Sequence, residues 1–143
     1  MQPVLDQQIL TAAYQLLPHG PELRLVSDII ALDSRVIHCR VAPTANNPLQ
    51  TDKSQMASFS CVEYAAQAAA IHGIAMGAHY DPLKPAYIGA VKDICLLQAE
   101  YAATHTITIQ ATQEYCENDG AIYSFSAYAE DAALITGRLI LKK

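Results

Sequence analysis

The chain has 143 residues, of which 52% are hydrophobic and 7% aromatic, and its formal net charge is −5. A chain of this length can bury a core without disulfide or metal cross-links, so we expect one domain over residues 1–143. The negative charge and the absence of any Lys/Arg cluster exclude a nucleic acid or an anionic membrane as the partner, because both require clustered basic side chains.

The cysteines and the apolar stretches predict a cytoplasmic protein that is not embedded in a membrane. The four cysteines lie far apart without C-x-x-C spacing, which favours reduced thiols in the cytoplasm. The first residues lack the basic and apolar regions of a signal peptide. The longest nearly apolar stretch, Ala65 to Ala78, is shorter than the roughly 20 residues that a membrane span requires.

The first third of the chain predicts a short helix followed by two strands. Apolar residues recur at helical spacing from Leu5 to Leu17, opposite a polar face rich in Gln, and Pro18 ends the pattern. Two runs rich in β-branched residues, Leu23 to Leu32 and Val36 to Val41, flank a short polar turn and predict a β-hairpin. A polar loop is expected from Pro43 to about Gln55.

The segment from Ser58 to Tyr80 predicts a long helix that is apolar on every side. Its central part contains only three strongly polar residues, Glu63, Gln67 and His72. A helix that is apolar around its whole circumference has to be buried on all sides.

The remaining third of the chain predicts strands. Beyond Pro85 the hydrophobic pattern has a period of two residues, and turns are expected at Asn118 to Gly120 and at Glu130-Asp131. The expected strands cover Tyr87 to Leu97, Thr104 to Tyr115, Ala121 to Ala129 and Ala133 to Leu141. The predicted fold is therefore an α+β hotdog fold: a short N-terminal helix and a long central helix wrapped by an antiparallel sheet of about five to six strands.

His19 is the first candidate catalytic residue. It stands between Pro18 and Pro21, which restrict the backbone just before the first predicted strand. A histidine held in this way is suited to act as a general base, although a lone histidine in a loop more often has no catalytic role. The other histidines are interpreted as structural, and their spacing predicts no metal site. They are His38, His72, His79 and His105.

Glu63 is the second candidate. Glu63 and Gln67 are four residues apart and therefore share one face of the predicted helix. A carboxyl group is costly to bury unless it is paired, neutral or used in chemistry, and a neutral buried acid is poised to donate a proton. The alternative interpretation is a capping box, in which Glu63 binds back to the backbone N–H of Ser60.

Together these segments resemble the 3-hydroxyacyl-acyl carrier protein dehydratases of bacterial fatty-acid synthesis and, more closely, the related dehydratases of aryl polyene pathways. The motifs that carry the resemblance are "LLPHGPELRLV" around His19, "NNPL" at Asn46 to Leu49 and "VEYAAQAAA" around Glu63. By position, His19 matches the family's catalytic histidine and Glu63 its catalytic carboxylate, while Gln67 matches a glutamine that supports the helix face. Ser58 occupies a position where the fatty-acid enzymes have glycine.

The resemblance implies elimination of water from a 3-hydroxyacyl thioester, with His19 as base and Glu63 as acid. Ser58, Phe59 and Gln67 are then expected to bind the substrate, because backbone N–H groups at a helix start can polarise a thioester carbonyl. The implied partners are an acyl carrier protein with a phosphopantetheine-linked substrate and a second hotdog subunit, in a homodimer or heterodimer. No cofactor is expected.

Two other functions are compatible with the same fold, since one fold hosts many activities. A thioesterase would use the helix carboxylate to orient water, which leaves the proline-flanked His19 unexplained. A non-catalytic subunit would bind acyl thioesters or pair with another hotdog protein. Turnover of 3-hydroxyacyl and acyl thioesters distinguishes the three.

Overall fold

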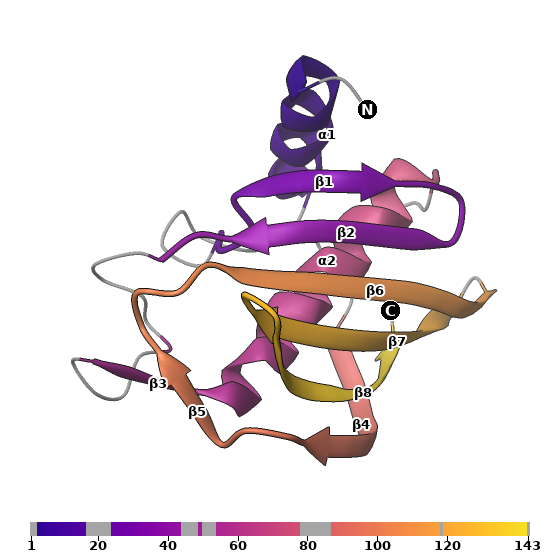
Figure 1. Ribbon diagram of the computed structural model, residues 1–143. Helices are drawn as coiled ribbons and strands as arrows, with labels where there is room; N and C mark the ends of the chain where they lie inside the picture. Colours follow the sequence, from indigo (N-terminus) through magenta and orange to yellow (C-terminus); the bar gives the residue numbers. More distant parts are fainter. Residues whose placement is uncertain are drawn as a thin grey trace.

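The computed structural model describes residues 3–16, 24–43, 49, 54–77, 87–117 and 119–142. These residues form two α-helices, a short 3-10 helix and eight strands (Figure 1). The elements in chain order are α1 (Pro3–Leu16), β1 (Asp28–Leu32), β2 (Val36–Val41), β3 (Gln55–Ala57), η2 (Ser58–Ser60), α2 (Cys61–Ala75), β4 (Tyr87–Leu96), β5 (Glu100–Ala102), β6 (Ile107–Glu117), β7 (Gly120–Ala129) and β8 (Ala132–Lys142).

Six strands form one antiparallel sheet in the order β1-β2-β6-β7-β8-β4, and β3 and β5 form a separate two-stranded sheet. β6, β7 and β8 are consecutive neighbours, which is the simplest connection for antiparallel strands. The two edges of the large sheet are β1 and β4, which precede and follow α2 in the chain (Figure 1).

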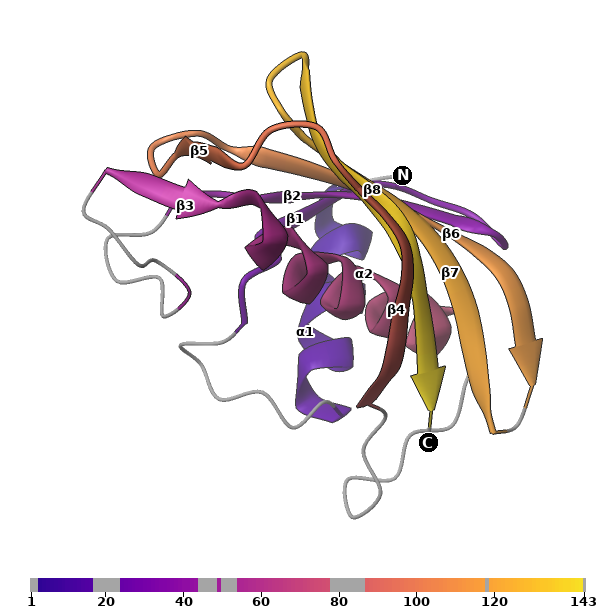
Figure 2. The ribbon, with the colours of Figure 1, turned by 90° about the horizontal axis from the view of Figure 1, so that it is seen from below.

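The large sheet curves over α2, and α1 lies beside α2 on the same side of the sheet (Figure 2). The strands turn alternate side chains toward this helix: in β6, Ile107, Ile109 and Ala111 are buried. The period of two residues in the sequence therefore marks the concave face, as predicted. This is the hotdog architecture expected from the sequence.

α2 is buried around most of its circumference. Ala65, Ala68 and Ala69 are completely buried, and their small side chains allow the sheet and α1 to approach the helix backbone closely. The expectation of burial on all sides is wrong along one narrow stripe, where Glu63 and Ile74 are only half-buried. In the single chain this stripe has less cover than the rest of the helix.

Two predicted boundaries are wrong, each for a local reason. β1 begins at Asp28 rather than Leu23, because the N–H groups of Leu25 and Val26 donate to side chains instead of to a neighbouring strand. α2 ends at Ala75 rather than at Tyr80, which lies outside the described residues. Gly77 has a φ of 93° and donates to the Ile74 carbonyl, a conformation that terminates helices.

β3, β5 and the start of β6 also differ from the sequence prediction. β3 and β5 were not predicted, because strands of three residues are too short to show a hydrophobic period. β6 begins at Ile107 rather than Thr104, so His105 lies in a bend before the strand rather than on its face. The Glu130-Asp131 turn is confirmed between β7 and β8, whereas Asn118 of the other predicted turn is outside the described residues.

All four cysteines are free: Cys39 and Cys61 are buried, and Cys95 and Cys116 are exposed. Neither α-helix in the described part of the chain is long and apolar enough to cross a membrane. Within the same residues, no group of three His, Cys, Asp or Glu side chains is arranged to hold a metal ion.

Candidate active site

The candidate site is built at the start of α2, where the 3-10 turn η2 leads into the helix. The N–H of Ser58 donates to the Ala99 carbonyl at 2.8 Å, which ties the turn to the segment between β4 and β5. Ser58 is completely buried, and its hydroxyl has no hydrogen-bond partner among the described residues. The next residue, Phe59, is 55% exposed. The two predicted substrate-binding residues of this turn thus differ sharply in exposure.

The serine half of the predicted capping box is absent. Ser60 precedes α2, but its φ of −61° and ψ of −21° are already helical, whereas a capping serine normally has an extended backbone. Its hydroxyl donates to the Ala57 carbonyl at 2.7 Å instead of accepting from the helix. The serine side of the predicted reciprocal pair is therefore not formed.

Glu63 lies in the first turn of α2 and is half-buried. Its Oε1 accepts a hydrogen bond of 3.2 Å from Nε2 of Gln67, one turn further along the helix. The structure therefore brings together the two polar residues that the sequence placed on one helix face. A positioned carboxyl group of this kind can exchange a proton with a ligand at the helix start.

Gln67 is fully buried and its amide has a defined orientation. Its Oε1 accepts from the Tyr14 hydroxyl at 2.6 Å and from the Leu25 N–H at 3.0 Å. A backbone N–H can only donate, so the atom facing Leu25 must be the oxygen of the amide. The amide nitrogen consequently points toward Glu63.

Tyr14 links this amide to the backbone before β1. Its hydroxyl donates to Gln67 and accepts from the Val26 N–H at 3.0 Å. Burial raises the pKa of the Tyr14 phenol far above its ordinary value, so the hydroxyl keeps its proton and remains a donor. The Arg24 guanidinium lies 5.8 Å from the centre of the Tyr14 ring.

The hydrogen bonds of Tyr14 and Gln67 hold both flanks of the segment that contains His19. Tyr14 precedes this segment, and Leu25 and Val26 follow it. His19 itself lies outside the described residues, as do Pro18 and Pro21. The described residues therefore give no distance between His19 and Glu63.

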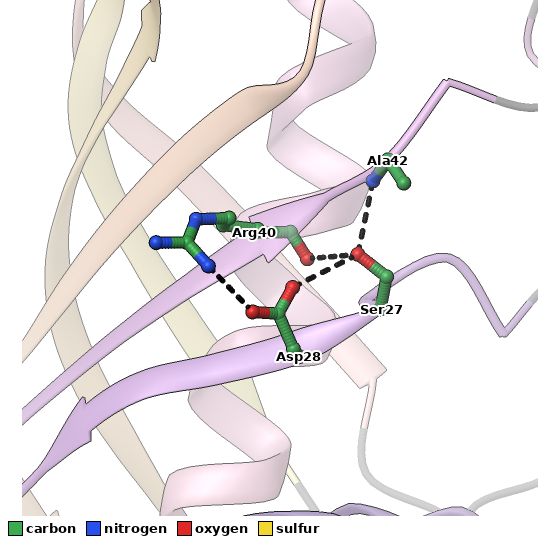
Figure 3. A network of polar contacts seen from close by, with 4 residues as sticks. All are labelled: Ser27, Asp28, Arg40 and Ala42. Carbon is green, nitrogen blue, oxygen red and sulfur yellow. Dashed lines mark hydrogen bonds and ion pairs between the residues drawn. The ribbon is translucent and has the colours of Figure 1, made fainter. Parts of the chain in front are cut away.

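Polar contacts among Ser27, Asp28, Arg40 and Ala42 fix the backbone that follows Leu25 and Val26 (Figure 3). The Ser27 hydroxyl donates to the Arg40 carbonyl and accepts from the Ala42 N–H, both at 3.0 Å. Arg40 also forms a 2.8 Å ion pair with Asp28 across the same two strands. These contacts join the two strands at the end of the β1–β2 hairpin that lies opposite its turn.

Tyr14 is the residue of this network that the sequence prediction missed. The helical period placed the N-terminal helix correctly, but nothing in the period marks one of its side chains as a hydrogen-bond donor. The available signal was chemical: a tyrosine on the buried side of a helix needs a partner for its hydroxyl.

A second buried polar network lies further along α2. His72 is completely buried, and its Nε2 donates to the Asp33 carbonyl at 3.0 Å while its Nδ1 accepts from the Tyr123 hydroxyl at 2.6 Å. The Tyr123 oxygen accepts in turn from Nε2 of Gln113 at 3.1 Å. Burial lowers the pKa of His72, which favours the neutral ring that this pattern requires. His72 is structural, as interpreted from the sequence.

The curved antiparallel sheet around α2 places the chain in the class of hotdog-fold proteins. A model of the ApeP-like family, described as ApeP dehydratase, matches residues 11–142. The chain belongs to the ApeP-like dehydratase family, the aryl polyene branch that its motifs resemble. A search of curated protein sequences finds no match.

Solved structures confirm the hotdog fold. The dehydratase heterocomplex ApeI:P from Xenorhabdus doucetiae is 16% identical, with a TM-score of 0.77 over 92% of this chain and 90% of that chain. The Escherichia coli PaaI protein of the phenylacetic acid degradation operon is 14% identical, with a TM-score of 0.65 over 96% of this chain and 94% of that one. A hypothetical thioesterase with coenzyme A from Streptococcus pneumoniae is 9% identical, with a TM-score of 0.62 over 95% and 94%.

Proposed function

We propose that the chain removes water from a 3-hydroxyacyl thioester and releases the trans-2-enoyl thioester, in fatty-acid-like or aryl polyene biosynthesis. The acyl group is carried on the phosphopantetheine of an acyl carrier protein. Membership of the ApeP-like dehydratase family supports the reaction class. The observation that carries the proposal is the half-buried Glu63 in the first turn of α2, held at one oxygen by the buried Gln67.

In this proposal His19 and Glu63 divide the elimination between them. His19 takes the proton from C2, the electrons of that bond form the C2–C3 double bond, and the bond from C3 to the hydroxyl breaks. Glu63 donates its proton to the departing hydroxyl, which leaves as water. A water molecule is the only by-product, so no cofactor is needed.

The start of α2 is proposed to bind the thioester. The Ser58 N–H is already bonded to Ala99, so the next N–H group in the turn, that of Phe59, is the better donor to the carbonyl. The exposed ring of Phe59 offers an apolar surface to the acyl chain, and Gln67 contributes by holding Glu63.

We further propose that a second hotdog subunit, identical or different, completes the site. The half-buried stripe of α2 and the edge strand β4 both lack full cover in the single chain. Exposed Phe59, Leu96 and Leu97 are large apolar side chains that a partner would shield. The ApeI:P protein of similar fold is itself a heterocomplex.

The single-domain and cytoplasmic assignments are also proposals. Buried residues from α1 to β8 belong to one continuous hydrophobic core, which supports one domain over residues 1–143. The free state of all four cysteines supports a reducing compartment.

The decisive experiment supplies the chain, alone and mixed with a hotdog partner, with 3-hydroxyacyl thioesters on carrier protein and on coenzyme A. We expect mass spectrometry to show loss of one water with the thioester intact. Release of free thiol without dehydration would establish a thioesterase instead. Binding without either reaction would establish a non-catalytic subunit.

Subunit mixing tests whether the site is shared in a homodimer. In the proposed dimer each site combines His19 of one subunit with Glu63 of the other. His19→Ala and Glu63→Gln chains are then each expected to be inactive, and hybrid dimers should regain activity because one of their two sites has both native groups. If activity does not return although subunit exchange is confirmed, the shared homodimeric site is wrong.

A further inference from the structure

The Gln67 amide connects Glu63 to groups that lie outside α2. Two donors converge on its oxygen, the Tyr14 hydroxyl at 2.6 Å and the Leu25 N–H at 3.0 Å. Two donors on the oxygen leave the amide NH2 facing Glu63, where Nε2 lies 3.2 Å from Oε1. The orientation of the amide, and with it the bond to Glu63, is set by groups outside α2.

We propose that Tyr14 is a positioning residue for Glu63, acting through the Gln67 amide. This inference rests on the proposed role of Glu63 as the proton donor. Its effect passes through the buried Gln67 amide, which bonds to the Tyr14 hydroxyl at one end and to the Glu63 carboxyl group at the other.

The hydroxyl of Tyr14 forms hydrogen bonds with two buried groups at once. It donates to Gln67, accepts from the Val26 N–H, and so keeps the backbone beside Leu25 in place for the second bond to Gln67. Loss of this oxygen removes one of the two donors to Gln67 directly. It also leaves the other donor, the Leu25 N–H, less firmly placed. The amide then has more freedom to rotate, and a catalytic group that shifts even slightly loses rate.

The Gln67 bond also distinguishes the two oxygens of Glu63. Oε1 faces an N–H donor, so a proton on that oxygen would compete with the amide hydrogen. A proton on the carboxyl group is therefore favoured on Oε2 rather than on Oε1. In the charged form, the same N–H stabilises the carboxylate.

Tyr14→Phe tests the inference, with Tyr123→Phe as the matched control. Both changes remove one buried phenolic oxygen, and both networks reach α2, but the Tyr123 oxygen bonds to His72 rather than to Gln67. We expect both variants to lose stability toward unfolding. Only Tyr14→Phe should alter the titration of the Glu63 carboxyl, followed by carbon-13 NMR of protein labelled at the glutamate carboxyls and assigned with Glu63→Gln.

The expected result is an upward move of the pH midpoint for Glu63 in Tyr14→Phe, because the carboxylate loses part of the stabilising N–H bond. An unchanged midpoint, or an equal move in Tyr123→Phe, would overturn the inference. If Tyr14→Phe fails to fold, Gln67→Met removes the same N–H donor, and an unchanged midpoint in that variant would also overturn it.

The titration needs no substrate, so its outcome is independent of whether the chain is a dehydratase. Where the wild-type protein dehydrates 3-hydroxyacyl thioesters, Tyr14→Phe should lower kcat by about 10-fold with little change in KM, as expected for a misplaced catalytic group. Tyr123→Phe should retain the wild-type kcat. Absence of dehydration by the wild type, with the midpoint moved as expected, would contradict the proposed reaction and leave the positioning role of Tyr14 intact.

Discussion

Two buried polar networks both include side chains of α2, but they end differently. The first runs from Tyr14 through Gln67 to Glu63, a half-buried carboxyl group at the helix start. The second joins His72 to Tyr123 and to the Asp33 carbonyl. Enclosed polar groups stabilise a fold, whereas a network that ends on a partly exposed acid positions that acid for a ligand.

The difference follows from how each network uses its donors and acceptors. The neutral His72 ring has one donor and one acceptor, and both are occupied by protein groups. A carboxyl group has about four lone-pair positions, and the bond from Gln67 orients Glu63 by occupying one of them. We therefore expect changes in the first network to affect turnover and changes in the second to affect stability.

The largest effect is expected for Glu63→Gln. Replacing the proposed proton donor should reduce dehydration by about 10²- to 10⁴-fold, the usual contribution of a positioned acid. The free energy of unfolding should change by less than about 1 kcal/mol, since Gln fills the same half-buried position. Initial rates and urea unfolding measure the two quantities. A variant that keeps wild-type turnover would show that Glu63 has a structural role. The two networks would then not differ in their effect on turnover.

The opposite pattern is expected for His72→Leu. The change leaves the Asp33 carbonyl and the Tyr123 hydroxyl without their ring partner, at a cost of about 2–4 kcal/mol in unfolding free energy. Turnover per folded molecule should stay within about twofold of wild type, because such a change away from the site acts on stability. Urea unfolding and active-site-normalised rates test this. A loss of rate with unchanged stability would make the second network functional as well.

The second network should also make the free energy of unfolding depend on pH. Burial lowers the pKa of His72 below its ordinary value, so over the interval between the folded and unfolded values the unfolded chain binds a proton that the folded chain does not. Its contribution to stability is complete above about pH 6.5 and decreases below it, by at most about 1.4 kcal/mol per pH unit, until folded His72 is also protonated.

This pH effect is measured as the difference in unfolding free energy between wild type and His72→Leu from neutral to mildly acidic pH. The other histidines are common to both proteins and cancel in the difference. A difference that stays constant with pH would show that His72 titrates alike in the folded and unfolded chains.

The smallest effect is expected at the surface. Asp28 and Arg40 form an ion pair as short as 2.8 Å, but their side chains are 44% and 50% exposed. Asp28→Asn should therefore cost no more than about 0.5 kcal/mol, and added salt should reduce the difference further. Thermal unfolding at two ionic strengths provides the measurement. A loss as large as that of His72→Leu would mean that burial is not what separates these networks.

Periodicity in the sequence determined the two helices, the strands of the large sheet and the hotdog fold. Side chains that alternate along a strand, or that are apolar on all sides of a helix, carry their own signal of burial. The family motifs around His19 and Glu63 likewise required no coordinates, since residue type and order carry the resemblance. The shared face of Glu63 and Gln67 followed from helical spacing alone.

Only the tertiary structure decided what surrounds those residues. The partners of Gln67 are Tyr14, 53 positions away, and Leu25, 42 positions away, and no local pattern connects such distant groups. The late start of β1 has the same origin, because side chains take the N–H groups that a strand would use. The fold likewise decided that the Ser60 side chain does not cap the helix, since its backbone is already helical. Hydrogen bonds between segments depend on how the elements pack, and packing is a property of the whole chain rather than of any one stretch.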